Sequence, residues 1–173
     1  MLQTFLVRSF WFVLLLMLQA LVFNQLRFVG YATPMPYVYF LLILPHGTAR
    51  WVYVVLGFAL GLAVDIFSNT IGAAAAAMTL VGLLTPHLLE MFTPEDKLDE
   101  EFNPSARTMQ WPRFLKYAGV ASLLHTIVFF FLESFSFLNP LLLSINIVGS
   151  WLLSLLFVAA IERIRISREK PTR

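Results

Sequence analysis

Long apolar stretches separated by short polar breaks dominate the chain. A helix needs about 20 mostly apolar residues to cross the hydrocarbon core of a bilayer. This pattern predicts an all-α integral membrane protein with a single transmembrane domain, residues 1–173, and about six transmembrane helices. The predicted spans are residues 10–27, 34–45, 51–67, 71–89, 114–137 and 141–161.

The second span is predicted to be short and broken. Thr33-Pro34-Met35-Pro36 precedes its apolar core and Pro45 follows it. Each proline removes a backbone donor and disfavours helix in the residue before it. A helix limited to about residues 36–44 is too short to cross alone. It either crosses with an extended lead-in that is buried against protein, or it re-enters on the same side.

The first apolar segment can be interpreted as a transmembrane span or as a cleaved signal peptide. We favour a retained span, because the apolar run is long and no clear small-residue cleavage site follows it. Further hydrophobic segments also continue along the whole chain.

Composition strengthens the membrane interpretation. Apolar residues make up 59% of the chain and charged residues 13%, against about 45–50% and about 25% in soluble domains. These values exclude a disordered protein and a nucleic-acid-binding module, and they disfavour a soluble enzyme. The chain has no cysteine, so neither disulfides nor thiolate metal sites can form.

The basic residues predict an orientation. Lys and Arg favour the cytoplasmic side of short loops. With six spans and a cytoplasmic N-terminus, eleven of the twelve basic residues are cytoplasmic and only Arg27 is outside. Five spans with an external N-terminus score equally well, with Arg8 as the exception. Charge therefore predicts that loop 90–113 and the basic tail 162–173 are cytoplasmic, and it leaves the N-terminus open.

Loop 90–113 is the longest polar segment. Its acidic part, residues 90–101, contains Glu90, Glu95, Asp96, Asp99, Glu100 and Glu101. It is either a docking loop for a cytosolic partner or a solvated hinge, and we favour the hinge.

Several polar residues fall inside predicted spans, where charges are costly and face the protein interior. Arg27, Asp65 and Glu133 are expected at similar depth near the outer boundary. They form either a proton or ligand site, or a structural ion pair beside a second acid near the headgroups. We favour the ion pair, with Arg27 as the partner of Asp65. His125 is expected near mid-membrane as a packing residue.

Two polar stripes are predicted to face each other. One carries Ser122, Thr126 and Glu133, and the other carries Asn146, Gly149, Ser150 and Ser154. They line a cavity or form interhelical hydrogen bonds. No metal-ligand spacing, phosphate loop or hydrolase motif is present in the sequence, so no catalytic residue is predicted.

Gly57, Gly61 and Asp65 recur every four residues and therefore share one helix face. Ser68-Asn69-Thr70 then form a tight turn before Gly72 and the alanine run 73–77. Small residues allow close helix contact. This segment predicts a packed helical hairpin or, alternatively, a groove for a partner.

The segment from Gly57 to Gly72 resembles the hallmark hairpin of the rod-shape-determining MreD family, in which a Gly-rich helix ends in Asp and a later Gly opens an Ala-rich helix. The chain length, the broken second segment and the basic ends are also similar. The acidic part of the loop is longer than expected for that family.

The resemblance implies a fold similar to the substrate-binding subunit of energy-coupling-factor transporters. It implies a non-enzymatic inner-membrane protein without cofactors that supports peptidoglycan synthesis and cell shape. The implied partners are MreC, a RodA-type glycosyltransferase with its class B penicillin-binding protein, the actin-like MreB indirectly, and membrane lipids. Gly57, Gly61, Asp65 and Gly72 carry over as packing or partner-binding residues.

The alternative is a transport subunit that binds a vitamin or another small molecule. Its ligand would lie near Arg27, Asp65, Glu133 and Asn146, with His125 in the same polar cluster. An intramembrane enzyme is a third and weaker alternative.

Overall fold

The computed structural model describes residues 2–26, 32–70, 72–97, 102–133 and 140–168. These residues form helices and connecting loops, and no strand is present among them. Five helices are long and apolar enough to cross a membrane, which supports a membrane-spanning protein. They are α1 (Leu2–Leu21), α3 (Arg50–Ser68), α4 (Ala73–Phe92), α5 (Trp111–Glu133) and α6 (Pro140–Arg168).

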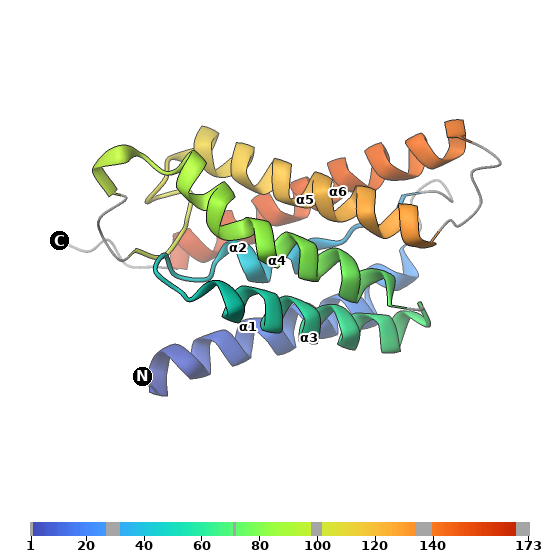
Figure 1. Ribbon diagram of the computed structural model, residues 1–173, viewed down its shortest axis with the longest axis horizontal. Helices are drawn as coiled ribbons and strands as arrows, with labels where there is room; N and C mark the ends of the chain where they lie inside the picture. The colour runs from blue at the N-terminus through green and yellow to red at the C-terminus, as the bar shows by residue number, and fades with distance from the viewer. Residues whose placement is uncertain (1, 27–31, 71, 98–101, 134–139, 169–173) are drawn as a thin grey trace.

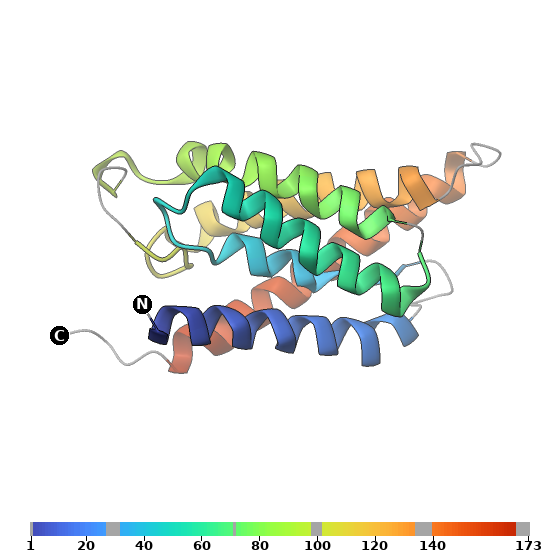
Figure 2. The same cartoon turned by 60° about the horizontal axis from the view of Figure 1, so that its bottom comes forward.

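The helices run side by side in an elongated bundle (Figure 1). α3 packs on α4, α4 on α5, and α5 on α6, while α1 packs mainly on α3 and on the second segment. The start of α1 and the end of α6 lie at one end of the bundle in both views (Figures 1 and 2). We call this the terminal end, and the other the distal end.

The second segment runs through the centre of the bundle from the distal end toward the terminal end (Figure 1). It comprises an extended stretch, a 3₁₀ turn η2 (Pro36–Val38) and the single-turn helix α2 (Tyr39–Leu42). Its side chains from Tyr37 to Leu42 are at most 1% exposed. The expected break is therefore present. Its backbone is buried in protein, because non-helical N–H and C=O groups inside a membrane cannot be exposed to lipid.

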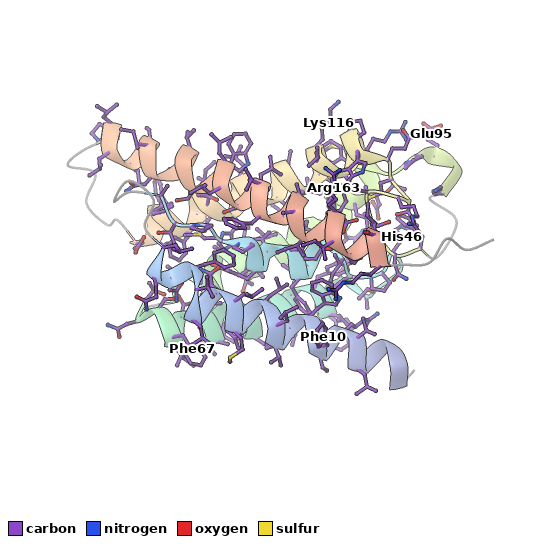
Figure 3. The ribbon with its side chains drawn as sticks, turned by 180° about the vertical axis from the view of Figure 1, so that it is seen from behind. Phe10, His46, Phe67, Glu95, Lys116 and Arg163 are labelled. Carbon is purple, nitrogen blue, oxygen red and sulfur yellow. The ribbon has the colours of Figure 1, made fainter. Side chains whose placement is uncertain are left out.

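The surface and the interior have the distribution expected in lipid. Large apolar side chains such as Phe10, Phe67, Ile66 and Leu156 are more than half exposed, and Figure 3 shows Phe10 and Phe67 pointing outward. Many hydroxyl-bearing side chains are instead buried, among them Thr85, Ser122, Ser150 and Tyr117. In a soluble helical bundle the polar residues lie on the surface and the apolar residues face the core.

Several helix ends differ from the predicted spans. α1 begins at Leu2 and ends at Leu21, before the 3₁₀ turn η1 (Phe23–Gln25), and α4 continues to Phe92. α5 begins three residues early at Trp111, and residues 134–137 of its predicted span lie outside the described residues. α6 extends to Arg168, seven residues beyond its predicted end. Hydropathy locates the apolar part of a helix, whereas the hydrogen-bonded helix continues into polar residues at the membrane surface.

Candidate functional site

A cavity of about 490 Å³ opens at the distal end of the bundle. We call it the polar cavity. Its polar lining comes from segments that are distant in sequence and includes Gln19, Asn24, Gln25, Thr33, Ser68, Thr70, Glu133 and Asn146. The predicted stripes on α5 and α6 thus meet here through Glu133 and Asn146, and α1 and the second segment complete the wall.

Hydrogen bonds organise one side of this cavity. Gln19 is only 2% exposed, and its amide nitrogen donates to Asn24 Oδ1 at 2.9 Å and to the Pro34 carbonyl at 3.3 Å. Asn24 in turn donates to Ser68 Oγ at 2.8 Å. The side-chain oxygens of Gln19 and Asn146 have no hydrogen-bond partner among the described residues. The cavity therefore offers hydrogen-bond acceptors to a polar guest.

Asp65 lies beside this cavity, in the hairpin between α3 and α4. It is 3% exposed. Its carboxylate accepts the backbone N–H of Ala74 at 3.0 Å and of Ala75 at 2.8 Å, and it accepts the hydroxyl of Thr70. Asp65 therefore caps the N-terminus of α4 from the neighbouring helix, where the helix dipole favours a negative charge.

Arg27, the expected partner of Asp65, lies outside the described residues. All the hydrogen bonds described for the Asp65 carboxylate come from the hairpin itself. The main-chain oxygen of Asp65 also accepts the N–H groups of Asn69 and Thr70, which closes the turn. Asn69 adopts the left-handed conformation, with φ 55°, that commonly ends a helix.

Gly57 and Gly61 lie where α3 and α4 approach most closely. A Cβ at Gly61 would lie 2.5 Å from the Ala74 carbonyl oxygen, and one at Gly57 would lie 2.7 Å from that of Met78. Gly82 on α4 makes a third such contact, 2.5 Å from the Tyr53 carbonyl oxygen. Gly82 is not among the residues predicted to pack in this hairpin, although it follows Ala74 and Met78 at four-residue spacing.

Gly72 has a different role from the packing role expected of it. A Cβ at this position would meet no atom within 4 Å. Its φ of +76° is in the left-handed region, which residues other than glycine rarely adopt. Gly72 is needed for the turn into α4, and the close contact is made by Gly57, Gly61 and the buried alanines.

His125 is completely buried behind the polar cavity. Its Nε2 is 3.0 Å from the hydroxyl of Tyr37, and its ring stacks on Phe129. Tyr37 and Phe129 line the cavity, and these two side chains separate His125 from it. It packs in the core, and its contact with the cavity is indirect.

Ser150 and Ser154 of α6 face the second segment and not α5. Ser150 Oγ accepts the N–H of Thr33 at 3.0 Å, and Ser154 Oγ accepts that of Met35 at 2.8 Å. Gly149 makes room for this approach, because a Cβ there would lie 3.0 Å from Ala32 Cβ. The expected α5–α6 hydrogen bonds are absent from these two serines, which instead satisfy the backbone donors of the extended stretch.

On the α5 stripe, Ser122 and Thr126 bond within their own helix. Their hydroxyls donate to the carbonyls of Ala118 and Ser122. Of the three residues predicted to share this stripe, only Glu133 reaches the polar cavity.

A second buried polar cluster lies at the terminal end. Glu162 is fully buried, and its carboxylate accepts the hydroxyl of Tyr39 and the N–H of Ala106, both at 2.6 Å. Arg165 lies 3.4 Å from the same carboxylate and donates to the Pro104 carbonyl. This cluster ties α2, the loop and α6 together.

From the sequence, Glu162 is the first residue of the predicted basic cytoplasmic tail, 162–173, whereas the structure buries it inside α6. The same cluster corrects the interpretation of the loop as a solvated hinge over part of its length. Ser105, Ala106 and Met109 are buried, while residues 98–101 of the acidic part lie outside the described residues. The sequence signal for the buried Glu162 was its spacing of three residues from Arg165, which places both on one face of the helix.

The structure thus brings Glu133 and Asn146 to one cavity and gathers Gly57, Gly61, Asp65 and Gly72 in one hairpin. Among the described residues, no group of three or more His, Cys, Asp or Glu side chains could hold a metal ion. Comparisons of this chain with models of protein families, with curated proteins and with solved structures found no match.

Proposed function

We propose that this chain is a non-enzymatic scaffold of the bacterial elongation machinery in the inner membrane. In this role it binds MreC and supports a RodA-type glycosyltransferase, its class B penicillin-binding protein and, indirectly, MreB. One observation carries the proposal. The residues that resemble the MreD hairpin each have a separate structural task in a single rigid unit, through the close contacts of Gly57 and Gly61, the turn at Gly72 and the cap by Asp65.

Such a hairpin is suited to present a fixed surface to another membrane protein. The outer face of α3 carries Val55, Phe58, Leu62 and Ile66, which are 42–72% exposed. These side chains form one apolar stripe at helical spacing. Because α3 is held against α4 by backbone-close contacts, the stripe is preorganised, which lowers the entropic cost of association.

The proposal can be tested with a photo-crosslinking amino acid at Leu62 or Ile66, in a rod-shaped bacterium that depends on this protein for its shape. We expect crosslinks to MreC from these positions. Leu152 and Leu156 on α6 are similarly exposed and serve as matched controls that should not crosslink to it. Crosslinks of equal yield from α6, or none from α3 in functional cells, would count against the proposal.

We also propose six crossings, with both termini in the cytoplasm, in an arrangement similar to the substrate-binding subunit of energy-coupling-factor transporters. The position of the start of α1 and the end of α6 at one end supports an even number of passes (Figure 2). Figure 3 shows the basic residues Lys116 and Arg163 toward that end, as expected if the charge rule applies.

The polar cavity favours a second candidate function, that of a transport subunit binding a small polar molecule. Its volume of about 490 Å³ is in the range of small-molecule sites. Uptake of radiolabelled vitamins by cells that also carry the coupling module tests this alternative. Uptake that is lost in Asn146→Ala and Glu133→Gln would support it, whereas rod-shape rescue by these same variants would support the scaffold.

A further inference from the structure

Two adjoining surface features lie at the terminal end of α5. The first, the basic cleft, has a volume of about 900 Å³, and its charged lining is Lys97, Arg107, Arg113 and Lys116, together with Glu95. The second, the apolar groove, has a volume of about 480 Å³ and is lined mainly by Leu115, Gly119, Val120, Leu123, Trp151 and Leu155. Phe92 and Lys116 line both features, so the cleft and the groove are continuous.

Among the described residues, the charged side chains that line the basic cleft are mostly positive. Its described charged lining has four cations and one carboxylate. Lys97 Nζ donates to the Thr108 carbonyl and Arg107 to that of Ile166, so both are held in place by main-chain oxygens. Arg113 and Lys116 are exposed, and Figure 3 shows Lys116 pointing away from the bundle.

The apolar groove runs from this cleft along α5 toward the middle of the bundle. Lys116 and Leu123 are seven residues apart, which corresponds to about 10 Å along a helix. Gly119 keeps the groove open, since a Cβ there would meet only Leu155 Cδ2, at 3.9 Å. The indole of Trp151 donates to the Gly119 carbonyl at 2.9 Å, which satisfies its polar atom and leaves its ring to line the groove.

We propose that the cleft and groove together bind an anionic diacyl phospholipid from the membrane leaflet at the terminal end. The lipid phosphate lies among Lys97, Arg113 and Lys116, and one acyl chain follows the groove past Gly119. Basic pockets between helices at the membrane surface suit such headgroups. A soluble anion would use the cleft alone, so the continuous groove favours a lipid over free phosphate. This site is separate from the polar cavity and from the outer stripe of α3.

The test is a lipid-dependent thermal shift of the full chain in a neutral detergent. Phosphatidylglycerol should raise the unfolding temperature in a saturable manner, and phosphatidylcholine with the same acyl chains should not. Glycerol phosphate, which carries the charge without chains, should also have little effect. In Arg113→Gln/Lys116→Gln, half-maximal stabilisation should need about thirtyfold more phosphatidylglycerol, because each basic residue near such a surface contributes about 1 kcal/mol.

Two further variants separate the groove from general charge effects. Gly119→Leu fills the groove and should abolish the shift by phosphatidylglycerol while all four cations remain. Arg50→Gln removes an exposed cation on α3 and should leave the shift unchanged. Equal stabilisation by both lipids, or an undiminished shift in the Arg113→Gln/Lys116→Gln protein, would overturn the proposal. If Gly119→Leu fails to fold, the cleft variants still decide it.

Discussion

Asp65 is a carboxylate whose partners are donors of its own hairpin. It accepts two backbone N–H groups of α4 and one hydroxyl. A buried charge is tolerated when it is hydrogen-bonded and lies at a helix N-terminus. This arrangement explains why an acid is present at the end of an apolar helix. Substitutions of Asp65 can therefore distinguish this helix cap from the expected ion pair with Arg27.

Asp65→Ala should lower the free energy of unfolding by about 2 kcal/mol, because it leaves the Ala74 and Ala75 N–H groups without their acceptor. Asp65→Asn should cost about 1 kcal/mol, since one oxygen remains. Thermal unfolding in detergent measures both, with the exposed Glu90→Gln as the control.

The charge swap Asp65→Arg with Arg27→Asp should not rescue stability. A guanidinium has only donors, and the groups facing residue 65 are donors as well. Recovery of the unfolding temperature in this double variant would show that pairing with Arg27 outweighs the cap.

At the scale of elements, the α3–α4 hairpin depends on a row of close contacts at four-residue spacing. Gly61 faces Ala74, Gly57 faces Met78, and Tyr53 faces Gly82. At these points the backbones approach too closely for a side chain, so the neighbouring main chain would have to move. Association of helices in lipid relies on such packing, because burial of apolar surface gives little gain there.

Gly61→Ala should therefore destabilise the protein by about 2–3 kcal/mol, the upper range for overpacking. The control is Ala59→Leu, which adds a larger side chain at an exposed position of the same helix and should change stability by less than about 0.5 kcal/mol. Thermal unfolding and the yield of monodisperse protein measure the effect. Equal behaviour of the two variants would contradict the close-packing interpretation.

The second segment depends on hydroxyls of α6. Ser150→Ala with Ser154→Ala removes the acceptors of the Thr33 and Met35 N–H groups. Each buried donor left without a partner costs about 1–3 kcal/mol. We expect a loss of about 2–4 kcal/mol in the double variant and faster hydrogen exchange at these two amides. Ser144→Ala, at an exposed serine that bonds to its own helix, should have no such effect.

At the scale of the whole molecule, one end carries the start of α1, the end of α6 and most of the described basic side chains. The charge rule assigns this end to the cytoplasm. Alkaline phosphatase fused after Gln110 or Arg173 should be inactive, and green fluorescent protein at the same points should fluoresce. Active phosphatase at either point would reject the orientation.

A phosphatase fusion after Val29 distinguishes six crossings from five. It should be active if the second segment crosses, because the end of α1 is then outside. Inactive phosphatase there, combined with fluorescent fusions after Gln110, would show that the segment does not cross.

The sequence alone determined the membrane class, the approximate positions of the five long helices and the break at the second segment. These features follow from local properties: the length of apolar runs, the backbone chemistry of proline and the four-residue spacing of Gly57, Gly61 and Asp65. The close contact of the α3–α4 hairpin was also predictable, since small residues on one face of two consecutive helices leave few other arrangements.

Only the tertiary structure decided which groups satisfy the buried polar atoms. Spacing places Ser150 and Ser154 on one face of α6, but not opposite the second segment, and it places Asp65 on a face without identifying the N-terminus of α4 as its partner. Glu162 illustrates the same limit, because its partners on α2 and in the loop are distant in sequence. The physical reason is that a hydrogen bond depends on positions in space, whereas periodicity along a helix records direction only.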